Sequence, residues 1–153
     1  MTVSPLVVWG PGAFRTMWPS EFNKLDLARR VSLTSTFDRI KIGAALINHG
    51  TLVSIGSNRP KSHPMQAKYN NIAKRVAPRH HLHAEMMALV NAKGEKETTN
   101  GATIYVYRQL ANGSLGNSRP CAACEAALKE AGVCSMLYTT TLGFVAESLS
   151  ANA

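Results

Sequence analysis

The sequence has few acidic residues, few aromatic residues and few cysteines. Asp and Glu number 9 against 17 Lys and Arg, which gives a formal charge of +8. Three cysteines cannot all pair with one another, so a disulfide-stapled fold is excluded. No run reaches the roughly 18 apolar residues of a membrane span, and a hydrophobic content of 45% argues against disorder. We expect one globular domain with no membrane partner and an anionic ligand.

The first residues differ in character from the rest, because a Gly-Pro-Gly break at 10–12 argues against a long helix there. No basic residue precedes Arg15, and the apolar run at 6–9 is too short for a signal sequence. We therefore expect a cytoplasmic protein. Residues 1–19 form an N-terminal arm that either lies over the domain surface or at a subunit contact, or is loosely ordered.

Residues 20–153 read as a single domain in which helical and extended patterns alternate. Helices are predicted at 20–33, 83–92 and 120–131, and strands at 40–48, 52–55, 103–108 and 133–140, with a last short element in 143–149. His49-Gly50 predicts a tight hairpin between the first two strands. Strands alternating with helices predict an α/β layered sheet.

Pro120-Cys121-Ala122-Ala123-Cys124 is a candidate metal motif. Two cysteines three residues apart lie on one face of a helix, and the positive end of the helix dipole favours their thiolate form. His83 can supply a third ligand to a zinc ion. Three protein ligands leave one tetrahedral position open, which is typical of a catalytic zinc site that activates water.

Glu85 follows His83 by two residues, a spacing that places two helical side chains roughly 200° apart. The two side chains converge only if the metal lies beyond the end of the helix. We therefore predict that two helices direct their N-termini at one zinc ion. Glu85 then reaches the reacting water without ligating the metal and transfers protons as the catalytic residue.

Each motif alone also has a simpler explanation. Cys-x-x-Cys is compatible with a redox pair, or with half of a structural zinc site completed by Cys134, His63, His80 or His81. Cys134 lies in an apolar segment, where we expect a buried, inert thiol. His-x-Glu alone is compatible with a helix cap. The presence of both motifs, with a predicted strand between them, favours catalysis.

The combined pattern His83-x-Glu85…Pro120-Cys121-x-x-Cys124 is the signature of zinc nucleobase deaminases. Over roughly residues 22–140 the chain resembles the cytidine and deoxycytidylate deaminase superfamily. The resemblance implies a three-layer α-β-α sandwich with a central mixed sheet of about five strands, a Zn²⁺ cofactor and a homo-oligomer. Asn58 resembles the family's strand-end asparagine, which touches the substrate sugar.

Lys61-Ser62-His63-Pro64 followed by Leu82-His83-Ala84-Glu85 resembles deaminase-like proteins of phages, and a phage-encoded protein would act in the host cytoplasm. Residues 59–82 form a long basic segment, an insertion in the predicted domain. Its charged residues are all basic: Arg59, Lys61, Lys68, Lys74, Arg75 and Arg79. We expect Arg59, Lys61 and also Arg119, which precedes the cysteine motif, to bind substrate phosphate. A long cationic surface also suits single-stranded nucleic acid. The simpler alternatives are a solvated basic loop and, for Arg119, a surface charge.

The resulting hypothesis is a hydrolase acting on the C–N bond of a cyclic amidine: a zinc-dependent deaminase of a cytosine nucleotide, most like dCMP conversion to dUMP and ammonia. One alternative is a polynucleotide deaminase acting on cytosine or adenosine in single-stranded DNA or tRNA. The other is a zinc-stabilised nucleic-acid-binding domain without catalytic activity. The sequence leaves base, sugar and number of phosphates open.

Overall fold

The computed structural model describes residues 6–9, 14–16, 19–37, 40–73 and 81–149. The strands are β1 (Leu6–Trp9), β2 (Phe14–Thr16), β3 (Ile42–Asn48), β4 (Thr51–Ser57), β5 (Thr103–Arg108), β6 (Ser135–Thr140) and β7 (Gly143–Ser148). The helices are α1 (Pro19–Ser32), α2 (Pro64–Ile72), α3 (Ala84–Asn91), α4 (Lys96–Thr99) and α5 (Ala122–Glu130). The strands form one mixed sheet in the order β2-β1-β7-β6-β5-β3-β4.

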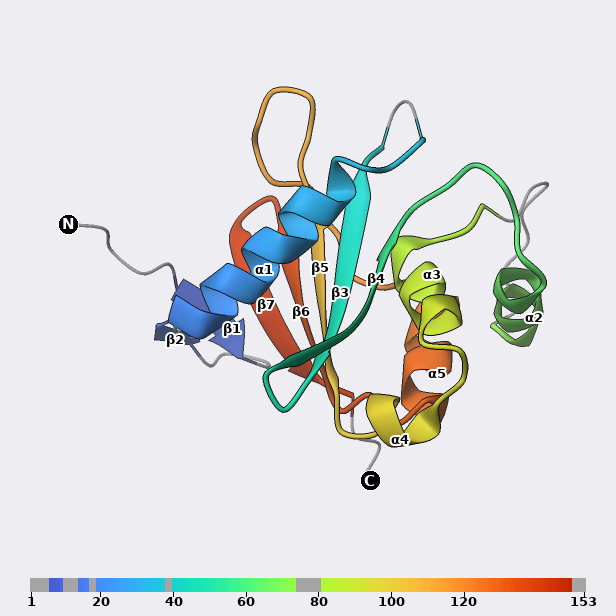
Figure 1. Ribbon diagram of the computed structural model, residues 1–153. Helices are drawn as coiled ribbons and strands as arrows, with labels where there is room; N and C mark the ends of the chain where they lie inside the picture. The colour runs from blue at the N-terminus through green and yellow to red at the C-terminus, as the bar shows by residue number, and fades with distance from the viewer. Residues whose placement is uncertain (1–5, 10–13, 17–18, 38–39, 74–80, 150–153) are drawn as a thin grey trace.

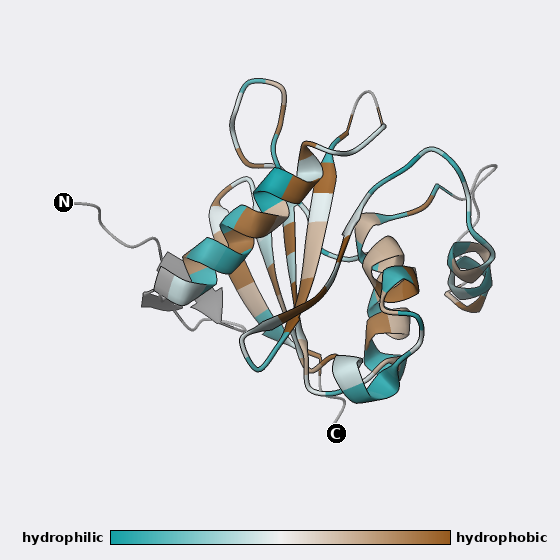
Figure 2. Cartoon of the chain, in the orientation of Figure 1, coloured by the Kyte–Doolittle hydropathy of each residue, from teal (hydrophilic) through white to brown (hydrophobic). Residues whose placement is uncertain are grey.

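Helices cover both faces of this sheet, with α1 on one side and α3 and α5 on the other (Figure 1). The alternation of side chains along β3 explains the two cores. Ala45 and Ile47 pack toward α1, whereas Ala44 and Leu46 belong to the larger cluster with α3 and α5. Hydrophobic residues accordingly concentrate along the central strands and α3 (Figure 2). The predicted α-β-α sandwich is confirmed, and β3–β7 are five of the seven strands of its sheet, with β4 at one edge.

The parallel pairing of β5 with β6 determines where α5 begins. Thr103 pairs with Ser135 at the start of both strands, so the intervening α5 must run back across the sheet. Its N-terminus therefore lies beyond the end of β5. Gly43 pairs with both Ser57 and Tyr107, which places the ends of β4 and β5 at the same edge. The functional motifs follow these two strands, and this edge brings them together.

The observed elements match most of the predicted ones but add several. The hairpin at His49 and Gly50 is confirmed, with positive φ values of 50° and 76°. The N-terminal segment contributes β1, which pairs in parallel with β7, and β2. The division into an arm of 1–19 and a domain of 20–153 stays a prediction.

The segment 59–82 contains a helix that the sequence analysis did not predict. Pro64 occupies the first turn of α2, where its missing N–H needs no partner, and the His63 ring accepts a hydrogen bond from the backbone N–H of Met65 at 3.1 Å. No helix was predicted in this segment, whereas in the structure Pro64 begins one. The expected burial of Cys134 was wrong, because it precedes β6 at an exposed position and its thiol donates to the Gly101 carbonyl.

Close packing of α3 on β4 leads to a first prediction, on stability. A Cβ added at Gly56 would lie 2.4 Å from the Ala84 carbonyl oxygen and 2.5 Å from the Ala88 nitrogen. Because both are helix backbone atoms, α3 must move to accommodate the methyl group. We expect Gly56→Ala to lower the free energy of unfolding by about 3 kcal/mol, measured by urea denaturation. Thr51→Ala, at an exposed position of the same strand, is the control, and equal stabilities would contradict the packing argument.

Candidate active and metal site

Two of the predicted ligands occupy equivalent positions at the ends of their helices. His83 is the N-cap of α3 and Cys121 the N-cap of α5, both with extended backbone. Neither side chain makes the capping hydrogen bond that an N-cap residue usually provides. The imidazole and the thiol are therefore directed beyond the helix ends, where each can bind a ligand instead. Cys124 follows in the first turn of α5 and is fully buried.

The three ligand atoms are spaced as a zinc site requires. Nδ1 of His83 lies 3.5 Å from the Cys121 sulfur and 3.4 Å from the Cys124 sulfur, and all three atoms lie within 4.8 Å of one another. Zn–S and Zn–N bonds of about 2.3 and 2.0 Å at a tetrahedral angle imply an N···S separation of about 3.5 Å. Both the donor set and the distances thus fit zinc.

The two thiols differ in acidity because they are hydrogen-bonded to each other. The hydrogen bond from Cys124 lowers the pKa of Cys121 to about 3, with help from His83. The same hydrogen bond and complete burial raise the pKa of Cys124. The lowered pKa favours the thiolate form of Cys121, which is the form that binds metal.

Glu85 lies in the first turn of α3 and is only 5% exposed. Burial raises the pKa of its carboxyl group, whereas the nearby His83 ring acts in the opposite direction. The side chain also interacts with Cys124 by a hydrogen bond. Glu85 is absent from the group of potential metal ligands, His83, Cys121 and Cys124. The Glu85 carboxyl group thus lies next to the three potential ligands without being one of them.

A cavity of about 270 Å³ opens onto these residues. His83, Glu85 and Cys121 form part of its wall. Phe37, Ile40, Ile42, Asn58, His81, Leu82, Asn117, Ser118 and Arg119 complete it. Phe37 and His81 meet edge to face, with ring centroids 4.9 Å apart, and this contact joins the segment after α1 to the segment before α3. The sequence analysis missed Phe37, because nothing in its local pattern marks it as part of a site.

Asn58 lines the cavity but already has several protein partners. Its Oδ1 accepts hydrogen bonds from the Ile42 backbone N–H at 2.9 Å and the Ser35 hydroxyl at 2.6 Å. Its Nδ2 donates to the Ile40 carbonyl at 2.7 Å. An amide nitrogen carries two hydrogens, so Nδ2 retains a second donor position. The contact of Asn58 with a substrate stays a prediction.

The structure separates the two basic residues that begin the segment 59–82. Arg59 and Leu82 exchange backbone hydrogen bonds of 2.9 and 3.1 Å, and the Arg59 side chain donates to the sulfur of Met87 on α3. Lys61 is exposed on the surface. Neither residue lines the cavity. Their substrate-binding role stays a prediction, and Lys74, Arg75, Arg79 and His80 lie outside the described residues.

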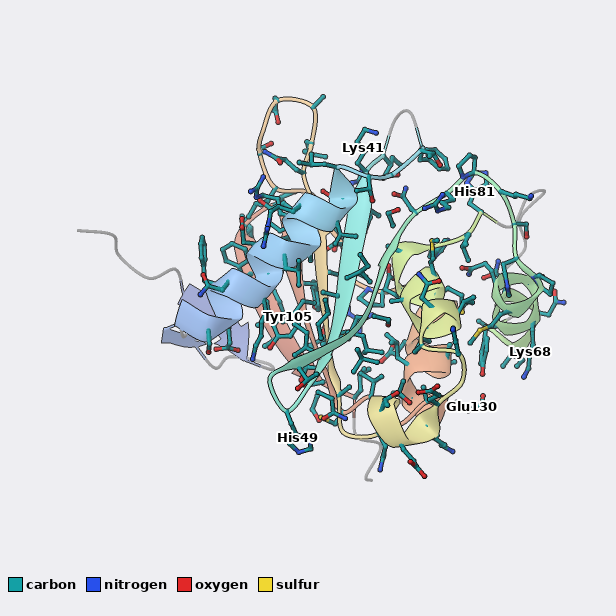
Figure 3. All side chains as sticks on the ribbon, in the orientation of Figure 1. Lys41, His49, Lys68, His81, Tyr105 and Glu130 are labelled. Atoms are coloured by element: carbon teal, nitrogen blue, oxygen red, sulfur yellow. The ribbon has the colours of Figure 1, made fainter. Side chains whose placement is uncertain are left out.

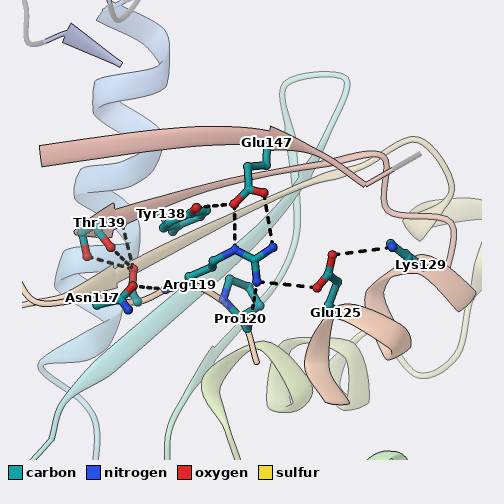
Figure 4. Close-up of polar contacts among 9 residues, drawn as sticks. Asn117, Arg119, Pro120, Glu125, Lys129, Tyr138, Thr139 and Glu147 are labelled. Carbon is teal, nitrogen blue, oxygen red and sulfur yellow. Dashed lines mark hydrogen bonds and ion pairs between the residues drawn. The ribbon is translucent and has the colours of Figure 1, made fainter. Parts of the chain in front are cut away.

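Arg119 lies at the cavity but is held by carboxylates of the protein (Figure 4). Its guanidinium donates to both oxygens of Glu147 at 2.9 and 3.3 Å and lies 3.6 Å from Glu125. Tyr138 also donates to Glu147. The hydrogen bond from Arg119 lowers the pKa of Glu147 and the same contact raises that of Arg119. This network ties β7 to the residue before Pro120 and so to the cysteine motif.

A closed zinc site would need a fourth ligand, and the described residues considered for this role have other contacts. The His63 ring caps α2, and His81 contacts Phe37. Cys134 is exposed and donates to Gly101. Among the described residues, the potential metal site contains three ligands and no fourth. Such a set leaves one coordination position for water or substrate.

Comparison with known proteins links this geometry to deaminases. The family model of the cytidine and deoxycytidylate deaminase zinc-binding region matches residues 20–140. The apo dCMP deaminase of cyanophage S-TIM5 is 22% identical over 81% of this chain and 86% of that one, with a TM-score of 0.57. Its complex with dCMP and dUMP gives the same TM-score and identity, over 84% of that chain. Cytidine deaminase from Burkholderia pseudomallei is 20% identical over 88% and 94%, with a TM-score of 0.60. No curated protein sequence matches significantly.

None of the helices in the described ranges has the length and apolar character that a membrane span requires.

Metal content provides a second prediction. We expect about one zinc ion per purified chain, from the single ligand set. Cys124→Ser removes a fully buried ligand and should bring the zinc content close to zero, measured by atomic absorption after dialysis. Cys134→Ser is the matched control, since Cys134 is exposed and distant from the ligand set, and it should keep its zinc. Loss of zinc from the control would indicate a closed, four-ligand site.

The Arg119–Glu147 pair provides a third prediction, on acid stability. In the folded protein the pKa of the Glu147 carboxyl lies below its ordinary value of 4.5. The ion pair therefore contributes its full stabilisation above pH 4.5, and this contribution decreases as the pH falls through the lowered pKa. Both side chains are partly exposed, so we expect Glu147→Gln to lose only about 1 kcal/mol at pH 7. The difference from the unmodified protein should shrink as the pH falls below 4.5.

Urea unfolding at pH 7 and in acid measures this difference. Glu97→Gln, at an exposed position of α4, is the control for loss of one negative charge. If the loss of unfolding free energy in Glu147→Gln stayed the same in acid, the ion-pair explanation would be wrong.

Proposed function

The chain belongs to the family of cytidine and deoxycytidylate deaminases with a zinc-binding region, and on that basis we propose that it hydrolyses the amino group of a cytosine mononucleotide. The leading reaction is conversion of dCMP to dUMP and ammonia. The observation that carries the proposal is the meeting of a buried carboxyl, Glu85, and an open three-ligand zinc set in one cavity. The family is one of zinc-dependent hydrolytic deaminases.

The size of the cavity supports a small substrate. Its volume of about 270 Å³ lies just below the usual range of about 300 to 1,000 Å³ for small-molecule sites, which suits a substrate as small as one base and its sugar. Phe37 and Ile42 offer apolar wall for the faces of a base, and Asn58 offers an amide donor. The cyanophage dCMP deaminase, which has the same fold, has been solved with dCMP and dUMP.

The reaction consumes one water molecule. A C–O bond forms at C4 of the cytosine ring, the C4–N bond breaks, and the amino group leaves as ammonia. His83, Cys121 and Cys124 would hold the zinc ion, which would supply the Lewis acid that activates the water. Glu85 accepts the proton of the attacking water, delivers a proton to ring nitrogen N3 and then assists departure of the amino group. Each transfer uses Glu85, the carboxyl group of the described residues that lines the cavity beside the ligands.

The charge distribution supports a limited phosphate contact. Arg119 is the basic side chain at the cavity wall within the described residues, apart from the imidazoles, and Glu147 holds it in place. We propose that its remaining donor capacity faces a single substrate phosphate. Of the three described cations of the basic segment, Arg59 packs on Met87 and only Lys61 and Lys68 are exposed, which gives little support for an extended nucleic-acid surface. A polynucleotide substrate and a homo-oligomer stay predictions.

A substrate panel tests the proposal and is the fourth prediction. The zinc-loaded protein is incubated with dCMP, CMP, dCTP, deoxycytidine and a single-stranded DNA oligonucleotide, and ammonia release and product mass are measured. We expect turnover of dCMP above the others. Glu85→Gln should lower kcat by about 10²- to 10⁴-fold, because it removes the proton-transfer group and keeps the size of the side chain.

Zinc content and circular dichroism of Glu85→Gln are the controls, and both should match the unmodified protein. Conversion of the oligonucleotide alone would transfer the assignment to a polynucleotide deaminase. If no substrate is turned over, or if all turnover survives Glu85→Gln, the proposed function is wrong.

A further inference from the structure

Helix α2 contacts both helices that carry the candidate zinc ligands. Gln66 accepts a hydrogen bond from the backbone N–H of His83, with 3.0 Å between Oε1 and N. One turn later, Tyr69 donates to the carboxylate of Glu130 at the end of α5, at 2.7 Å. Figure 3 shows α2 outside α3 and α5, with Glu130 at the far end of α5. The helix of the basic segment therefore bridges the two halves of the site.

The N–H of His83 needs a partner from outside its own helix. As the N-cap of α3, His83 has a backbone carbonyl that accepts from Met87 at 2.9 Å, whereas its N–H has no acceptor within the helix. Gln66 is 0% exposed, so water does not replace it easily. The amide oxygen of Gln66 thus satisfies a donor on the backbone of a metal ligand.

The orientation of the Gln66 amide is fixed at its other end. Its Nε2 donates to Oδ1 of Asn70, one turn further along α2, at 3.0 Å. Asn70 is also buried. Because an amide has one accepting and one donating side, the contact with Asn70 directs the oxygen toward His83. The preceding residue, Leu82, is held by its two backbone hydrogen bonds with Arg59.

We infer that Gln66 is a positioning residue for the zinc site, which fixes the backbone of His83 and so the direction of its imidazole. The inference assigns a role in metal binding to the segment 59–82, in addition to any role of its charges. Partners of this kind, which contact the ligand and not the metal, typically change metal affinity by 10- to 100-fold when removed. The contact here is to the ligand's backbone, so we expect an effect of about tenfold.

The test is the fifth prediction and compares two changes on the same helix. Gln66→Met keeps an unbranched side chain of similar length and removes the acceptor. Tyr69→Phe removes the bond between α2 and α5 and leaves Gln66 in place, so it is the matched control. The full-length protein is titrated with zinc against a chromophoric chelator, and thermal unfolding of the metal-free form is measured in parallel.

We expect Gln66→Met to raise the zinc Kd about tenfold and Tyr69→Phe to leave it within about twofold. The visible absorption spectrum of Co²⁺ bound in place of zinc should change in Gln66→Met and not in Tyr69→Phe, because only the first change frees the His83 backbone. Unchanged affinity and spectrum in Gln66→Met would overturn the inference. Equal loss of affinity in both variants would also overturn it, since α2 would then act by packing alone.

A second variant covers the case in which Gln66→Met does not fold. Gln66→Glu keeps an acceptor oxygen within reach of the His83 N–H, and its second oxygen can accept from Asn70 once the Asn70 amide has turned. We expect this variant to bind zinc within about threefold of the unmodified protein. A folded Gln66→Glu that loses affinity tenfold would contradict the role of the acceptor oxygen. None of these measurements uses a nucleotide, so the inference and the proposed substrate can fail independently of each other.

Discussion

The meeting of two helix N-termini at one edge of the sheet is the constraint on which the site depends. Parallel pairing of β5 and β6 requires α5 to run back across the sheet, and the shared register of β4 and β5 with β3 places the start of α3 at the same edge. At each start an N-cap residue directs its side chain outward, where partial positive charge of the helix favours a thiolate. Without this topology His83 and Cys121 would not lie within 3.5 Å.

Several polar side chains at the cavity are already bound to the protein, and this limits what they offer to a substrate. Asn58 joins the segment before β3 to the end of β4 through three hydrogen bonds. Arg119 is neutralised by Glu147 and lies near Glu125. Such contacts hold a side chain in one orientation before the substrate arrives, which lowers the entropy lost on binding. Each of these two side chains can therefore stabilise the cavity wall and still offer a remaining N–H donor to a substrate.

The residues that meet at the site could be predicted from the sequence, whereas the residues that support them could not. His83, Glu85, Cys121 and Cys124 are recognisable because their types and spacings are local and chemically specific. Gln66 belongs to no recognisable sequence motif, and its partner His83 lies 17 residues further along the chain. Helix α2 was not predicted, and its start at Pro64 with the His63 ring as its N-cap is visible only in the structure. Cys134 was assigned to the core from its apolar neighbours, although β6 begins one residue later.

The period of α2 shows how one segment can hold two kinds of residue without conflict. Gln66, Tyr69 and Asn70 are spaced three and four apart and form the buried side that faces α3 and α5. Lys68 lies between them in sequence but on the outward side of the helix (Figure 3). A substitution on the outward side therefore changes charge without disturbing the zinc ligands, whereas one on the inward side does the opposite. The charge on the outward side of α2 and the geometry of the metal site can thus be changed separately. If a substitution on the outward side also changed the metal site, the effect would have to pass through the backbone of α2.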